Sequence, residues 1–184
     1  MRDTIKLGFM LFLITAIAAL VLSVSNQITA PKILESIIKT NQEARLAVLD
    51  TADTFEKIEV QGEENIVEIY EGNKDDLVVG YTIKTISNGF GGKLEVLTGI
   101  SKDGEVTGMK LLSHTETPGL GANAAKDEFQ SKFLKKNSTD LVSINKVEPQ
   151  NDNEVQAITG ATITSKAVAK AVNTALEYFE ANFK

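Results

Sequence analysis

Four hydroxyl side chains lie close together in one short stretch of the chain, residues 157–166. The stretch surrounds a Gly-Ala pair just before a predicted helix, and its hydroxyl residues are Thr159, Thr162, Thr164 and Ser165. A hydroxyl oxygen at a helix start accepts hydrogen bonds from the free backbone N–H groups of the first turn. The same N–H groups, with the helix dipole, also favour a phosphate there. The stretch can therefore cap a helix, hold a phosphate or carry one covalently, and spacing alone favours capping.

The helix that follows is predicted from the spacing of its apolar residues. Val168, Val172, Leu176 and Phe179 recur at steps of three and four residues, which places them on one face. We expect this helix to begin around residues 164–166.

A second loop with unusual composition covers residues 114–122. Its Thr-Pro-Gly sequence favours a tight turn, and Leu120 stands alone between Gly119 and Gly121. The loop either connects a strand to a helix with Leu120 covering the core, or brings backbone N–H groups and one apolar side chain against a flat ligand. A helix is expected over residues 122–136, with Ala125, Phe129 and Phe133 facing inward.

Short segments rich in β-branched residues predict a group of strands between these loops and the N-terminal region. A strong Asp-Gly turn signal at Gly104 joins the strands expected at residues 93–100 and 105–112. Their residues Leu94, Val96, Met109 and Leu111 would share one face. Phe90 lies among three glycines, which either let the backbone approach a ligand or simply form a turn. The expected strands are residues 56–60, 66–70, 77–86, 93–100 and 105–112, with a further possible strand at 143–147.

The N-terminal region contains an uncharged apolar run, Leu7–Val24. As a helix its 18 residues would rise about 27 Å, close to the roughly 30 Å of a membrane hydrocarbon core. The run exceeds a signal-peptide core and lacks a clean cleavage site, which favours a retained anchor. Arg2 and Lys6 precede the run, which favours a cytoplasmic N-terminus with the bulk of the chain outside. We divide the chain into an anchor (1–28), a helical stalk (29–50) and one domain (51–184). The stalk either begins a helix with Pro31 in its first turn or extends the membrane helix, and a second helical stretch covers residues 41–49.

Composition excludes several classes of function. The chain has 184 residues, a net charge of −6, no cysteine and a single histidine, His114. An acidic chain without a basic block is not expected to bind nucleic acid. Without cysteine, and with one histidine, we expect no metal site, and a Ser–His–Asp triad would have to use His114.

The two loops, in this order and behind one membrane segment, resemble the FMN-binding domain of the G subunit of the Rnf electron-transport complex. The related C subunit of the sodium-translocating NADH:quinone reductase is similar. The resemblance covers nearly the whole chain and implies an α+β fold, in which an antiparallel sheet flanked by helices follows a single transmembrane helix.

The resemblance also implies a site. The family's Ser/Thr-Gly-Ala-Thr motif falls on Thr159, Gly160, Ala161 and Thr162, and the family's last threonine bears FMN through a phosphoester, so Thr162 is the expected attachment site. The other expected cofactor-binding residues are Ile163, Thr164 and Ser165 after the motif, and Glu116, Thr117, Gly119, Leu120 and Gly121 near the flavin ring. Where the family often has an acidic residue, three positions before the motif, this chain has Gln156. Thr164 and Ser165 are assigned capping and phosphate-side roles, and His114 a position near the flavin loop.

The function implied is that of an electron carrier. An Rnf-type complex moves electrons between reduced ferredoxin and NAD and couples this to Na⁺ or H⁺ translocation. This chain would be one carrier in that path, bound to other membrane subunits and loaded with FMN by a separate flavin transferase. The alternatives are a C-type subunit of a quinone reductase, and a non-redox anchored surface module in which both loops are structural.

Overall fold

The computed structural model describes residues 2–60 and 63–184 of the chain, which divides into two compact units. The first unit ends at Asn41, and the second comprises Gln42–Lys184. Helix α1, Arg2–Val48, contains Pro31 in its interior. The stalk therefore extends the anchor helix, which was one of the two alternatives, and Pro31 does not begin a new helix. A proline removes only one intrahelical hydrogen bond, which the adjoining turns tolerate here. Among the described residues, α1 is long and apolar enough to cross a membrane.

The second unit is built on a five-stranded antiparallel sheet in which each strand pairs with the next along the chain. This confirms the antiparallel α+β prediction. Strand β2 is longer than predicted, so its hairpin to β3 turns on only Asp75 and Asp76, which both have positive φ. Such turns match the twist of antiparallel strands. The strands are β1 (Thr54–Ile58), β2 (Ile66–Lys74), β3 (Leu77–Asn88), β4 (Lys93–Ser101) and β5 (Val106–Ser113).

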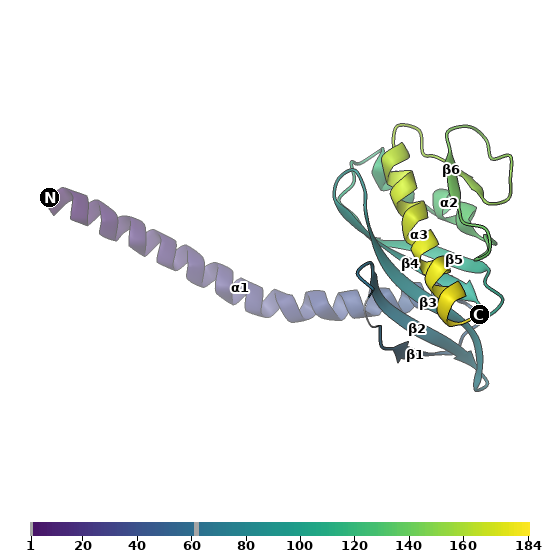
Figure 1. The fold of residues 1–184 in the computed structure, drawn as a ribbon. Coiled ribbons are helices and arrows are strands. Elements are labelled where there is room, and N and C mark those ends of the chain that lie inside the picture. The colour runs from purple at the N-terminus through teal and green to yellow at the C-terminus, as the bar shows by residue number, and fades with distance from the viewer. Residues whose placement is uncertain (1, 61–62) are drawn as a thin grey trace. The chain divides into compact units, whose positions relative to one another are not determined.

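Helix α3, Thr162–Asn182, covers one face of this sheet (Figure 1). Its four predicted inward residues, Val168, Val172, Leu176 and Phe179, are fully buried. They share one core with Leu94, Val96, Met109 and Leu111 of strands β4 and β5, as the alternation predicted. A hydroxyl also joins the layers, because Thr85 Oγ1 donates to the carbonyl oxygen of Ala171 at 3.0 Å.

The opposite face of the sheet receives the last residues of α1 and Leu49. Two cross-strand glycine pairs line this contact, Gly72 with Gly80 and Gly99 with Gly108. A Cβ added at Gly99 would overlap the carbonyl oxygen of Val48, and one at Gly72 would overlap the side chain of Leu49. Glycine is therefore required where the helix end approaches the strands, and Val48 and Leu49 are buried as a result.

Charged groups fix the same helix end. Arg45 Nη1 lies 3.6 Å from Glu68 Oε1, and its guanidinium lies 3.9 Å from the ring centre of Tyr70. Lys84 Nζ lies 3.8 Å from Glu68 and 3.1 Å from Glu95. The Arg45 and Lys84 side chains are only 9% and 10% exposed, so each cation needs these carboxylates as partners.

The connection between the sheet and α3 differs most from prediction. Residues 122–136 do not form one helix, because the backbone at Lys126 is extended. Phe129 and Phe133 are buried as predicted, but Ala125 is exposed, which contradicts its predicted inward position. A parallel pair of short strands follows, of which only the first was predicted. The elements are η1 (Gly121–Ala125), α2 (Asp127–Gln130), η2 (Ser131–Phe133), β6 (Ser143–Asn145) and β7 (Glu154–Gln156).

The glycine contacts predict unequal costs for two similar substitutions. Gly99→Ala should lower the free energy of unfolding by about 3 kcal/mol, because the added methyl group meets backbone that cannot move away. Gly72→Ala should cost less, about 2 kcal/mol, because the added methyl group meets the flexible end of Leu49, which can shift, and the Cβ of Ala52, but no backbone atom. Urea unfolding of the full-length chain in detergent, followed by near-UV circular dichroism, measures both. Equal stabilities of the two variants would contradict this packing.

Candidate functional site

A cavity of about 360 Å³ opens where three segments meet: the tip of the β3–β4 hairpin, the loop after β5 and the first turn of α3. Its volume lies at the low end of the range of about 300–1,000 Å³ that is usual for ligand sites. The two loops selected from the sequence thus lie side by side, although they are far apart along the chain. The lining residues are Phe90, Glu116, Thr117, Leu120, Gly121, Gly160, Ala161, Thr162, Ile163 and Thr164.

The start of α3 lies earlier than predicted, at Thr162 rather than at residues 164–166. Its N-cap is Ala161, which makes no side-chain cap hydrogen bond, so capping by a hydroxyl residue was wrong. Ser165 instead holds the preceding loop, because its Oγ donates to Ala161 O at 2.9 Å and accepts from Ile158 N at 3.0 Å. Gly160 turns the chain into the helix with a φ of 77°.

The four hydroxyl groups of the stretch have different surroundings. Thr164 and Ser165 are buried, and both donate hydrogen bonds within the protein. Thr159 is exposed and lines a neighbouring cavity instead. Thr162 is half-buried and lines the main cavity, and its hydroxyl has no hydrogen-bond partner among the residues described. Of the four hydroxyls in this stretch, that of Thr162 is therefore the one that is both free and inside this cavity; Thr117, from the loop after β5, lines the cavity as well.

The carboxylate of Glu116 joins all three segments of the site. Its Oε2 accepts from Thr164 Oγ1 at 2.7 Å, and its Oε1 accepts from the backbone N–H of Gly91 at 3.0 Å. The neighbouring glycines leave it room, because a Cβ at Gly89 or Gly121 would overlap its oxygens. Glu116 was predicted to bind the cofactor near the flavin ring. The structure shows in addition that it holds the hairpin tip, its own loop and α3 together.

These contacts control the ionisation of Glu116. Burial, with only 6% of the residue exposed, favours the neutral acid and raises its pKa. The hydrogen bonds from Thr164 and from the N–H groups of Gly91 and Phe90, with His114 nearby, outweigh burial, so the pKa lies below its ordinary value of 4.5. Glu116 is therefore ionised at neutral pH. His114 is half-buried, and its Nδ1 accepts a bond from the Glu116 N–H at 3.3 Å, so it braces the loop.

The first turn of α3 offers backbone donors to the cavity. The N–H groups of Thr162, Ile163 and Thr164 precede the first helical bond, which Ser165 N donates to Ala161 O at 3.0 Å. They form the positive end of a 21-residue helix. An anionic group beside Thr162 would meet these donors.

The three largest apolar side chains of the cavity lining are exposed. Phe90 is 70% exposed, Ile163 56% and Leu120 45%, and each comes from a different segment. The arrangement suits a flat apolar ligand with one anionic end. Phe90 was not among the predicted site residues, and its three glycine neighbours were the only signal for it. Of the residues predicted to bind the cofactor, Thr159, Gly119 and Ser165 lie outside this lining.

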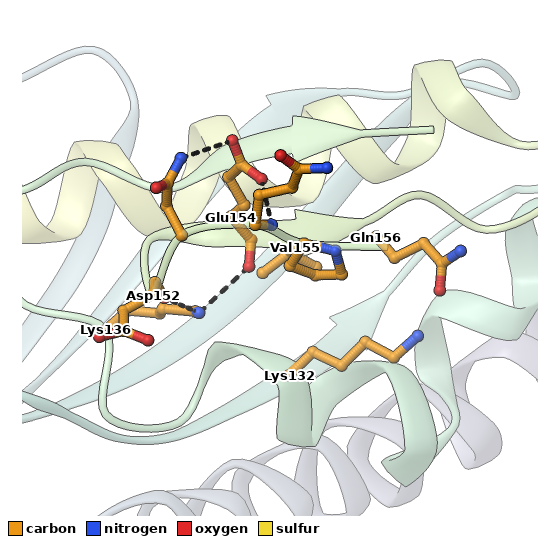
Figure 2. Close-up of a pocket in the computed structure, with 9 residues that line it drawn as sticks. Lys132, Lys136, Asp152, Glu154, Val155 and Gln156 are labelled. Atoms are coloured by element: carbon orange, nitrogen blue, oxygen red, sulfur yellow. Dashed lines mark hydrogen bonds between the residues drawn. The ribbon is translucent and has the colours of Figure 1, made fainter. Parts of the chain in front are cut away.

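A second cavity, of about 380 Å³, lies beside β7 and is polar (Figure 2). Two of its charged groups, those of Lys136 and Glu154, bond to the chain itself. Lys136 Nζ donates to the carbonyl oxygens of Asp152 and Glu154. The Glu154 carboxylate accepts from Gln150 N at 2.8 Å and from Asn151 Nδ2 at 3.1 Å. These bonds hold the segment that leads into the hydroxyl stretch. Gln156, at the position where the resembled family often has an acidic residue, lines this cavity.

Comparison with known families identifies the domain that contains the main cavity. Residues 89–177 match the FMN-binding domain family. The match begins at the tip of the β3–β4 hairpin and includes both loops and most of α3. It therefore includes every residue that lines the main cavity.

Two relatives are similar over most of the chain. The G subunit of the Na(+)-translocating ferredoxin:NAD(+) oxidoreductase complex of Acetobacterium woodii is 41% identical, over 95% of this chain and 91% of its own length. The G subunit of the proton-translocating ferredoxin:NAD(+) oxidoreductase complex of Clostridium ljungdahlii is 36% identical, over 88% of this chain and 83% of its own length.

Two solved structures share the fold. The C subunit of the Na(+)-translocating NADH-quinone reductase of Parabacteroides distasonis has a TM-score of 0.53 at 24% identity, covering 61% of this chain and 60% of that one. The NqrC structure of Shewanella oneidensis has a TM-score of 0.54 at 16% identity, covering 67% of this chain and 69% of that one. At these identities the likeness concerns the fold alone.

The Glu116 contacts predict a pH-dependent contribution to stability. At neutral pH, Glu116→Gln should lower the free energy of unfolding by about 2 kcal/mol, because a neutral amide cannot accept all the bonds that the carboxylate accepts. The folded pKa is depressed, so this contribution is fully present above the ordinary value of 4.5 and is lost as the pH falls through the folded pKa.

Urea unfolding of both proteins at neutral pH and at steps below pH 4.5 measures the difference between them. Other carboxylates titrate in both proteins and cancel in this comparison. Glu128→Gln, at an exposed position on α2, is the matched control and should change stability little. A Glu116→Gln difference that stays constant as the pH falls would argue against an ionised Glu116 in the folded protein.

Proposed function

We propose that this chain, which belongs to the G-subunit family of ion-translocating ferredoxin:NAD(+) oxidoreductase complexes, carries FMN covalently on Thr162 and passes electrons through it. The chain is an electron-carrying member of such a membrane complex and not a complete catalyst alone. The observation that carries the covalent assignment is the Thr162 hydroxyl, which lines the main cavity without a partner among the described side chains.

The residues around the cavity fit FMN. The exposed apolar side chains of Phe90, Leu120 and Ile163 suit the isoalloxazine ring. The free N–H groups at the start of α3 suit the phosphate, which a bond to Thr162 would hold beside them. FMN, when bound, supplies the redox chemistry, and the protein sets its position and potential.

Loading requires a second protein. A threonine hydroxyl is a poor nucleophile without a base. The ionised Glu116 bonds to Thr164 and not to Thr162, and His114 accepts a backbone bond. We therefore propose that a flavin transferase, using FAD and Mg²⁺, loads the chain. Thr162 Oγ would bond to the FMN phosphorus as the pyrophosphate bond of FAD breaks. The departing AMP would take up the proton of the threonine hydroxyl.

The membrane placement follows from α1. The apolar part of this helix anchors the chain, and the same complex supplies other membrane subunits as partners. Arg2 and Lys6, which precede the apolar run, support a cytoplasmic N-terminus and an FMN domain on the outer face. A covalent bond would then prevent loss of a cofactor that is not resupplied outside the cell. The membrane anchor (1–28), stalk (29–50) and FMN domain (51–184) remain our proposed division.

Replacement of Thr162 tests the attachment. After co-expression with a flavin transferase, the intact mass of the wild-type chain should exceed that of the bare polypeptide by one FMN less one water. Thr162→Ala should show the bare mass and no in-gel flavin fluorescence after denaturation. Thr51→Ala removes an exposed hydroxyl outside the motif and outside the cavity and should remain fully loaded. Flavin fluorescence that survives denaturation in Thr162→Ala would exclude Thr162 as the site.

Cysteine labelling tests the orientation, because the chain has no cysteine of its own. A cysteine placed by Asp103→Cys in the exposed β4–β5 turn should react with a membrane-impermeant thiol reagent in intact cells. A cysteine placed by Asp3→Cys, before the apolar run, should react only after lysis. The reverse pattern would place the domain on the cytoplasmic side.

A further inference from the structure

Phe90 has a fixed backbone and a free ring. The hairpin tip closes with a bond from Gly89 N to Gly92 O at 2.8 Å. The next loop then holds the tip, because Gly91 N donates to Glu116 Oε1 at 3.0 Å and Thr115 Oγ1 donates to Gly91 O at 2.9 Å. A Cβ at Gly91 would overlap the Thr115 carbonyl, so the two loops touch backbone to backbone. The Cα of Phe90 therefore has little freedom to move.

The ring nevertheless stays out of the core of its own domain. Phe90 is 70% exposed although it lines the main cavity, whereas Phe129, Phe133 and Phe179 are buried. A single exposed apolar side chain is ordinary on a protein surface. Phe90 differs because Leu120 and Ile163, which are also exposed, line the same cavity from two other segments. Together they make an apolar wall that no described part of the chain covers.

We infer that Phe90 is a positioning residue for the flavin: its ring packs against the isoalloxazine ring and shields it from solvent. The inference rests on the proposed function, since it assumes FMN on Thr162, and it adds a residue that the loop motifs do not contain. Aromatic rings favour offset-stacked or edge contacts with flat ring systems. Glu116 and Thr115 hold the hairpin tip, and Glu116 also bonds to α3. These contacts therefore fix the position of the Phe90 backbone beside the cavity.

The test compares solvent access to the attached flavin. Intact mass first establishes that each variant carries one FMN, which tests the proposed function separately. Iodide quenching and fluorescence anisotropy of the flavin are then measured on the full-length, loaded chain in detergent. Phe90→Ala should keep its FMN but show stronger iodide quenching and lower anisotropy, because the flavin loses one wall. Phe90→Tyr keeps the ring and should restore both values.

Leu77 provides the matched control. It begins strand β3, at the end of that strand away from the hairpin tip that carries Phe90, is 71% exposed and does not line the cavity. Leu77→Ala should leave quenching and anisotropy at the wild-type values. The inference is overturned if loaded Phe90→Ala matches wild type in both measurements. It is equally overturned if Phe90→Ala fails to take up FMN, because the role assigned to Phe90 begins after attachment. A wild-type chain without FMN would instead count against the proposed function.

Discussion

A single buried carboxylate, that of Glu116, joins the three segments that form the cavity. Its two oxygens accept bonds from α3 and from the β3–β4 hairpin tip, and its backbone belongs to the loop between them. The hairpin tip, the loop after β5 and the first turn of α3 are thereby joined at one carboxylate. Burial works against the charge, and the hydrogen bonds more than offset it, so the carboxylate stays ionised. With Thr164 bound to Glu116 and Ser165 bound within its loop, Thr162 is left as the one hydroxyl of the stretch 157–166 that is free and lines the cavity.

The sheet supplies the rigid support that this arrangement needs. One face packs against the apolar side of α3, which fixes the helix whose first turn forms the cavity. The other face receives Val48 and Leu49 across two pairs of glycines, and the Arg45 and Lys84 ion pairs close this contact. Both faces are therefore covered by the chain itself, and the site is left at the end of the sheet where the hairpin tip and the α3 start meet. This is where the domain presents exposed apolar side chains together.

Much of the fold could be predicted from local pattern. Alternation predicted the strands, and steps of three and four residues predicted the buried face of α3. The family resemblance predicted that the two loops form one site. Three features could not be read in this way. The start of α3 was misplaced because Ser165 bonds to its own loop and leaves Ala161 as the N-cap. Residues 122–136 have a helical apolar spacing, but the extended backbone at Lys126 divides them. The joining role of Glu116 depends on partners 25 and 48 residues away, which sequence spacing does not reveal.

The central claim is that one hydroxyl of the four carries the flavin. Cleavage after Lys146 and Lys166 releases a peptide, residues 147–166, that contains all four of them. Tandem mass spectrometry of this peptide from the native membrane complex locates any adduct directly. The account predicts one FMN phosphoester, with fragment masses that place it on Thr162. An adduct on Thr159, Thr164 or Ser165, or an unmodified peptide, would contradict it.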